Sequence, residues 1–267
     1  MPPHMLDELP TELRLSIVEL CDLKGLIKVR SLSKSWRALV MQSPHVRINP
    51  TRRKLLDLYD FCLKSKSFRA SRETVIPLLK PLDRSHYLER LSDKPLPEAF
   101  DMWIREWPAK AAFGYLWPGL DGAILPLQPA HGVRTIPEFI RFRRPESYPI
   151  GEADLFVDRK FLLQHGIQEG SHQWPINSDY GRFKVNTLKI QHDPYLRSLS
   201  GLYAGISYVT LIIANGQPWN GSVQYEYFTR PNRMPMIWQR SQYASWIEFM
   251  KNEIHHIQKI RSYHTQS

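Results

Sequence analysis

Three short segments near the start of the chain carry apolar residues at helical spacing. In the first of them, Leu13, Ile17 and Leu20 recur at positions i, i+4 and i+7, which places them on one face of a helix. The second segment has its apolar residues between positions 23 and 32, and the third between positions 36 and 40. This pattern predicts a small module of three helices.

Residues that favour helix starts and stops separate these segments. Pro10 suits the first turn of the first helix, where its missing N–H would have no partner anyway. Asp22 can cap the second helix, and Ser33 can cap the third. Ser43-Pro44 is expected to stop the third helix, because the residue before a proline disfavours helical geometry.

Helices of this length cannot hide all of their apolar side chains among themselves. Each fully buried Leu or Ile contributes about 1.5–3 kcal/mol, so an apolar stripe that the module leaves uncovered favours contact with another surface. Periodicity alone leaves two partners open: the rest of this chain or another protein.

The spacing of these residues is more specific than their periodicity. The positions that agree with one family pattern, in register and without a gap, are Leu9-Pro10-x-Glu12-Leu13, Ile17, Leu20, Leu26, Val29, Ser33 and Trp36-Arg37-x-Leu39. On these residues the segment from Leu9 to Pro44 closely resembles F-box domains. Ser33 is a departure, since many members of that family have cysteine there.

The resemblance implies a three-helix module that binds a Skp-type adaptor, itself attached to the cullin scaffold of a ubiquitin ligase. It implies that the residues facing or supporting the adaptor are Leu9, Pro10, Leu13, Ile17, Leu20, Leu26 and Val29. Trp36 is expected to hold the third helix in place and to lie beside the interface. The implied function is that of a non-catalytic substrate receptor, which brings an unidentified protein for ubiquitination.

The residues that follow predict a connector and then a second, larger unit. The segment 53–63 reads as a basic helix, and four prolines between positions 77 and 97 divide the chain into short pieces. We therefore predict an F-box domain over 1–50, a basic linker helix and connector over 51–82, and an α+β recognition domain over 83–267. Its first strong helix carries a core-forming stripe of Phe100, Trp103, Ile104 and Trp107.

Strand signals dominate from about residue 123 onward. Phe183 and Val185 alternate with polar residues, and 208–214 is a continuous apolar run typical of a central strand. The segment 223–227 also alternates, and two Asn-Gly turns before it favour a hairpin with a long loop. An amphipathic helix over 242–260 closes the chain. These signals predict an α+β class with a mainly antiparallel sheet and covering helices.

This larger unit is similar, at scattered positions between residues 83 and 260, to the SUKH superfamily (Smi/Knr-like domains). The matching positions are Leu88-Glu89, Leu96-Pro97-x-x-Phe100-x-x-Trp103-Ile104, Val209-Thr210-Leu211, Gly221-Ser222-Val223 and Tyr243-x-x-Trp246-Ile247. Trp107-Pro108 departs from the family, which often has an Asn-Gly turn there. The resemblance implies a regulatory, protein-binding module with no particular ligand, and it supplies an alternative function for the chain.

Composition bears on location and on charged partners. The start of the chain has no apolar signal segment, and no apolar stretch reaches the roughly 20 residues needed to span a bilayer. The two cysteines, Cys21 and Cys62, fit buried thiols, so a cytoplasmic or nuclear location is expected.

The net charge of +10 concentrates between Arg52 and Arg72, with a second cluster at residues 141–144. Because aromatic residues do not alternate with these cations, an acidic protein or solvent is favoured over nucleic acid or another anionic surface.

No motif or spacing predicts catalysis, a metal site or a cofactor. The sequence has no Gly-x-Ser-x-Gly elbow and no phosphate-binding glycine loop, and its histidines lack metal-ligand spacing. Substrate recognition is instead expected in the larger unit. The candidate substrate-binding residues are Trp219, which Pro, Asn and Gly surround, and Trp238.

Overall fold

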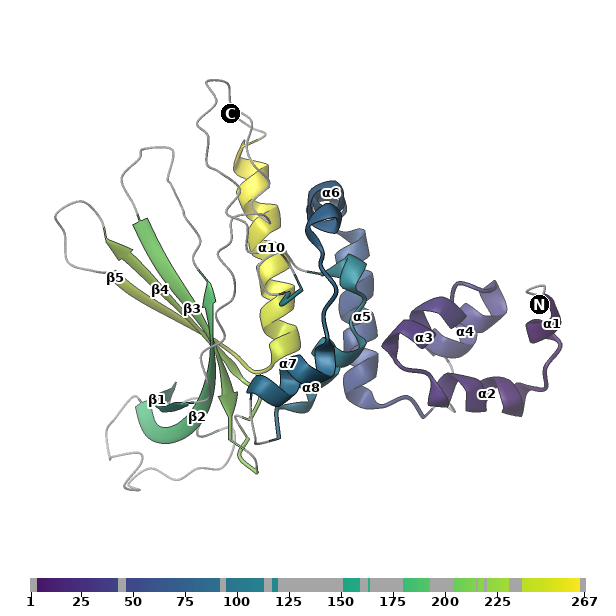
Figure 1. Ribbon diagram of the computed structural model, residues 1–267, viewed down its shortest axis with the longest axis horizontal. Coiled ribbons are helices and arrows are strands. Elements are labelled where there is room, and N and C mark those ends of the chain that lie inside the picture. The colour runs from purple at the N-terminus through teal and green to yellow at the C-terminus, as the bar shows by residue number, and fades with distance from the viewer. Residues whose placement is uncertain are drawn as a thin grey trace.

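The computed structural model describes residues 4–42, 47–91, 95–112, 117–119, 151–158, 163, 180–192, 204–214, 216–218, 220–230 and 237–264. Within these residues a β-sheet lies at one end of the molecule and the four N-terminal helices lie at the other (Figure 1). The remaining helices fill the space between them, and α10 (Trp246–His264) lies next to the sheet. Helices and an antiparallel sheet that occupy separate parts of the molecule confirm the α+β class.

The N-terminal helices follow the predicted start signals closely. They are α1 (His4–Asp7), α2 (Thr11–Leu20), α3 (Leu23–Val29) and α4 (Lys34–Gln42). The Asp22 side chain accepts a hydrogen bond of 2.7 Å from the backbone N–H of Gly25, and Ser33 Oγ accepts one of 3.3 Å from the N–H of Trp36. Both predicted caps are therefore confirmed. Pro10 takes the N-cap position of α2, one residue before the first turn where it was expected.

Helix α5 (Pro50–Lys64) is longer than the predicted helix over 53–63. It begins earlier because the Asn49 side chain accepts hydrogen bonds from the N–H groups of Thr51 and Arg52, at 2.8 and 3.1 Å. Its side chains Leu55, Leu56, Leu58 and Cys62 are fully buried. Because α5 packs against α3 on one side and against α8 (Glu98–Glu106) and α10 on the other, it is core as well as connector.

The helical region between α5 and the sheet consists of short elements. These are α6 (Lys66–Val75), η1 (Ile76–Leu78), α7 (Arg84–Leu91), α8 and η2 (Ala109–Ala111). The predicted stripe on α8 is confirmed as core, since Phe100, Trp103, Ile104 and Trp107 are completely buried. Trp103 lies at the centre of an aromatic cluster, with ring centroids 5.3 Å from Trp117 and 5.2 Å from Trp246.

The sheet is an antiparallel meander. Its strands, in spatial and sequence order, are β1 (Gly151–Asp158), β2 (Tyr180–His192), β3 (Ala204–Ile213), β4 (Val223–Arg230) and β5 (Ile237–Tyr243). The predicted central strand and the predicted hairpin are both confirmed: β3 occupies the middle position and pairs with β4, with Leu211 opposite Val223. In the connecting loop the Asn220 side chain accepts a 2.9 Å hydrogen bond from the Ala214 N–H, and Gly221 has a φ of +83°, which favours glycine.

The predicted start of the last helix at residue 242 is wrong. Residues up to Tyr243 belong to β5, and α10 begins at Trp246. The start is set by a capping box in which Ser245 Oγ accepts from the Glu248 N–H (3.2 Å) while the Glu248 carboxylate accepts from the Ala244 N–H (2.8 Å). The pattern Ser-x-x-Glu was present in the sequence and would have placed this boundary.

Candidate functional site

Helix α2 carries apolar side chains on two opposite sides. Val18 is completely buried against the neighbouring helices, whereas Leu13 is 53% exposed and Leu20 is 88% exposed. Ile17 lies between these two environments and is half-buried. An exposed leucine alone is ordinary, but two on one face of a helix, with Ile17 between them, mark a candidate contact surface. We call Leu13, Ile17 and Leu20 the α2 surface.

The other residues predicted to face or support an adaptor lie in different surroundings. Pro10 is exposed, and Leu9 and Val29 are half-buried. Leu26 and Trp36 are fully buried, so in this structure they support the helices from inside. An adaptor contact by any of these residues stays a prediction. Sequence reasoning did not select Leu32 and Met41, which are each 38% exposed.

The α2 surface lies over the part of the hydrophobic core that the F-box helices contribute. Leu23, Leu26, Trp36 and Val40 are buried together with Val18. Hydrogen bonds join the helices around this core: Arg14 donates to Ser35 Oγ (2.8 Å), and Ser33 Oγ donates to the Asp7 carboxylate (2.9 Å). The outward leucines are therefore held on a packed support and are not needed to build it.

Comparison with protein-family models identifies this part of the chain. The model of the F-box domain matches residues 6–46. Residues 6–46 are an F-box domain. The match includes α2, α3 and α4 and extends slightly beyond the predicted limits of 9 and 44. No characterised protein and no solved structure matched the chain significantly. The SUKH resemblance over 83–260 stays a prediction.

F-box domains bind Skp-type adaptors, and F-box proteins are usually non-catalytic members of ubiquitin ligase complexes. The α2 surface belongs to the segment that carries this family match. The matched residues end before α5 and do not include the larger unit.

Glu106, at the end of α8, links the F-box to the rest of the chain through hydrogen bonds. The Glu106 carboxylate accepts a 2.8 Å hydrogen bond from the backbone N–H of Leu23, the first residue of α3. It also receives two hydrogen bonds of 2.7 Å from the Arg52 guanidinium on α5. The hydrogen bond to Glu106 raises the pKa of Arg52. A negative charge at the start of α3 is favourable, since the helix dipole is positive there.

Further polar contacts hold the F-box and α5 in one orientation. Arg30 forms a two-pronged ion pair with Asp60 at 2.6 and 2.7 Å, and its guanidinium lies 5.4 Å from the centre of the Tyr59 ring. Arg53 donates a hydrogen bond to the backbone oxygen of Val40. Contacts of this kind, made on several sides of α5, oppose independent rotation of the F-box.

We expect that Glu106→Gln lowers the free energy of unfolding by about 2 kcal/mol, because it leaves the half-buried Arg52 guanidinium without its counter-charge. The same change at Glu89, which is exposed on α7, is the control. Chemical denaturation of the two variants measures the difference. Equal stability of Glu106→Gln and Glu89→Gln would show that the contact with Glu106 does not hold the F-box in place.

The basic cluster between Arg52 and Arg72 is partly used inside the protein. Arg52 and Arg53 are engaged as described above. Arg72 donates to the backbone oxygens of Lys110 (3.0 Å) and Ala112 (2.8 Å), and its guanidinium stacks 3.9 Å from the centre of the Phe68 ring. Burial lowers the pKa of Arg72 to about 10, so it stays charged at neutral pH. The exposed members of the cluster are Lys54, Lys64, Lys66 and Arg69. The cluster at 141–144 lies outside the described residues.

The two cysteines are unpaired, and neither has the surroundings of a reactive thiol. Cys62 is fully buried and Cys21 is half-buried. Burial raises the pKa of both thiols, most strongly that of Cys62, which disfavours the nucleophilic thiolate at neutral pH.

Within the described ranges there is no group of three or more His, Cys, Asp or Glu that could hold a metal ion. No helix in that part of the chain is both long and apolar enough to cross a membrane.

The side chains of the two candidate substrate-binding residues lie outside the described part of the structure. Trp219 lies outside the described residues. Trp238 belongs to β5, where its backbone pairs opposite Phe228 of β4, and its side chain is outside the described part. Their role in substrate recognition stays a prediction.

Proposed function

We propose that this protein is the substrate-receptor subunit of a Skp–cullin–F-box ubiquitin ligase. In this proposal the α2 surface docks the Skp-type adaptor, and the adaptor links the chain to the cullin. The observation that carries it is the exposure of Leu13 and Leu20 on an F-box domain whose Val18, on the same helix, is buried in the hydrophobic core. Apolar side chains that the fold does not need are available to a partner.

The α+β unit is proposed to bind the substrate. A receptor needs a recognition surface and no chemistry of its own, because ubiquitin transfer is carried out by its partners. Burial raises the pKa of both thiols, which is compatible with a non-catalytic role. Alternatively, the chain is a SUKH-like regulatory protein. In that case the α+β unit also binds another protein, but the chain does not join a ubiquitin ligase.

The junction between the F-box and α5 supports the proposal. A receptor must hold its substrate at a set position relative to the adaptor, and the contacts of Glu106 and Arg30 keep the F-box in one orientation. Proximity and orientation favour transfer between two bound groups. We also propose a cytoplasmic or nuclear location, which the two unpaired cysteines support.

Affinity purification from cells that make either the natural chain or the Leu13→Asp, Leu20→Asp variant tests the receptor function. The natural chain should recover a Skp-type adaptor and a cullin. The variant should lose both and should retain more of the substrate, because substrate that is bound but not ubiquitinated accumulates. Recovery of the cullin by both chains would contradict the proposal.

A further inference from the structure

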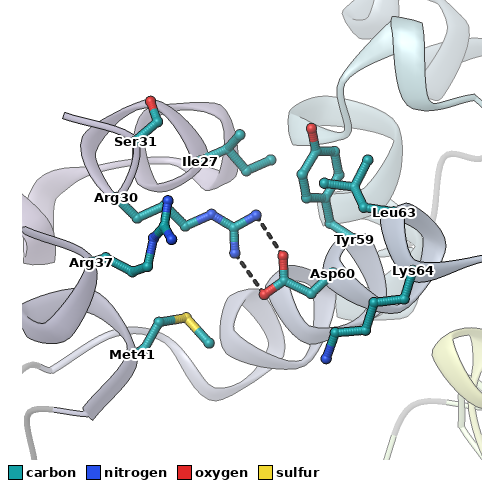
Figure 2. A pocket seen from close by; sticks show the side chains of 9 residues that line it. All are labelled: Ile27, Arg30, Ser31, Arg37, Met41, Tyr59, Asp60, Leu63 and Lys64. Carbon is teal, nitrogen blue, oxygen red and sulfur yellow. Dashed lines mark hydrogen bonds and ion pairs between the residues drawn. The ribbon is translucent and has the colours of Figure 1, made fainter. Parts of the chain in front are cut away.

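A groove runs between the F-box and α5, away from the residues of the α2 surface. Its volume is about 510 Å³, and Figure 2 shows the side chains that face it. The F-box wall comes from α3, α4 and the turn between them, and the opposite wall comes from α5. The lining residues are Ile27, Arg30, Ser31, Arg37, Met41, Tyr59, Asp60, Leu63 and Lys64. We call it the junction groove.

Both walls of the junction groove offer apolar side chains. Met41 of α4 is 38% exposed and Leu63 of α5 is 42% exposed. Ile27 and Tyr59, on the side of the groove where Leu63 lies, are half-buried. Side chains of this size, arriving from two elements at one hollow, are suited to receive an apolar side chain of a ligand.

The groove also has an excess of positive charge. Arg30 and Asp60 neutralise each other through their two-pronged ion pair, which joins the two walls (Figure 2). Arg37 and Lys64 are exposed on opposite walls, and in the part of the chain that the structure describes neither forms an ion pair. The groove therefore presents two available cations beside its apolar side chains.

We propose that the junction groove binds an acidic peptide segment of a partner protein, which places an apolar side chain against Ile27 and Leu63 and carboxylates beside Arg37 and Lys64. A peptide fits better than single-stranded nucleic acid, because proteins that bind single strands combine a longer basic groove with exposed aromatic rings for stacking. Since no residue of α2 lines this groove, the site is separate from the α2 surface and does not depend on the proposed ligase function.

The binding of a fluorescent peptide of alternating glutamate and leucine to the full chain tests this proposal, with fluorescence anisotropy as the measurement. The variant Arg37→Glu, Lys64→Glu should bind about tenfold more weakly, because it replaces two attractions with two repulsions. The matched control is Lys54→Glu, Lys66→Glu, which makes the same charge change at exposed lysines that do not line the groove. The peptide affinity of the control should lie within about twofold of that of the natural chain, since charges away from the contact are screened by salt.

Leu63→Gln supplies a second test that leaves the charge unchanged. Leu63→Gln should lower the affinity for the same peptide severalfold, because the groove loses part of its apolar surface. Circular dichroism confirms that each variant is folded. Equal loss of affinity in the two charge-reversed variants, or equal binding of a lysine–leucine peptide of the same length, would overturn the proposal.

Two further measurements separate this site from adaptor docking. The Leu13→Asp, Leu20→Asp variant should bind the peptide like the natural chain, even where it no longer binds a Skp-type adaptor. The natural chain saturated with adaptor should also retain peptide binding. Displacement of the peptide by the adaptor would assign the groove to the adaptor interface and would overturn a separate site.

Discussion

Replacing Leu13 and Leu20 together with aspartate should weaken binding to a Skp-type adaptor by at least about 100-fold. Full burial of a leucine contributes about 1.5–3 kcal/mol, and about 2.7 kcal/mol corresponds to a factor of 100 in affinity. Each aspartate would also bring a charge into an apolar contact, which adds a desolvation cost. Because Leu20 is 88% exposed and Leu13 is 53% exposed, the folded chain itself should lose little stability.

Isothermal titration calorimetry with a purified Skp-type adaptor measures this effect. Ile76→Asp is the control, because Ile76 is an exposed apolar residue (38%) in η1, outside the F-box. Circular dichroism shows whether each variant is folded. A folded double variant that binds the adaptor as tightly as Ile76→Asp does would show that the adaptor does not use the α2 surface.

The largest loss of stability is expected from Trp103→Ala. The Trp103 side chain is fully buried, and its ring contacts Trp117 edge-on at 5.3 Å and Trp246 at 5.2 Å between ring centres. Removing a buried tryptophan takes away its transfer free energy and leaves a cavity, with a cost of about 3–5 kcal/mol. Trp103 joins α8 to α10, so the loss should affect the whole helical layer beside the sheet.

Denaturation with urea, followed by circular dichroism, measures this loss. Trp103→Phe should recover part of it, because phenylalanine keeps an aromatic ring in the cluster and leaves a smaller cavity. A loss below about 1 kcal/mol for Trp103→Ala, no larger than an average point substitution causes, would contradict the central place of Trp103 in the core.

Local signals predicted much of the fold. The caps formed by Asp22 and Ser33 act over three residues, so the starts of α3 and α4 could be read directly from the sequence. The pairing of β3 with β4 was also predictable, because an apolar run and an alternating segment flank a loop with turn residues. Each of these features depends on residues close together in the chain.

Contacts between distant residues could not be predicted in this way. Glu106 reaches Leu23 across 83 positions and Arg52 across 54 positions, and no periodicity connects them. The basic residues Arg52 and Arg72 therefore read as free surface charge, although the first pairs with Glu106 and the second caps backbone oxygens near residue 110. The use of α5 as core likewise became visible only once α8 and α10 were placed beside it.

The sequence predicted which segment forms the candidate site, but it predicted only some of the residues that are exposed there. Spacing placed Leu13 and Leu20 on one helix face, and both are exposed. Periodicity cannot say whether an apolar residue points into its own module or out of it. Leu26 and Trp36 match the family pattern as well as Leu20 does, yet both are buried inside the F-box.

Co-elution of the purified full chain with a purified Skp-type adaptor in size-exclusion chromatography tests whether the α2 surface docks the adaptor. We expect a single complex that contains both proteins, and we expect that the Leu13→Asp, Leu20→Asp variant does not form it. Separate elution of the natural chain and the adaptor, with both folded and at micromolar concentration, would contradict it.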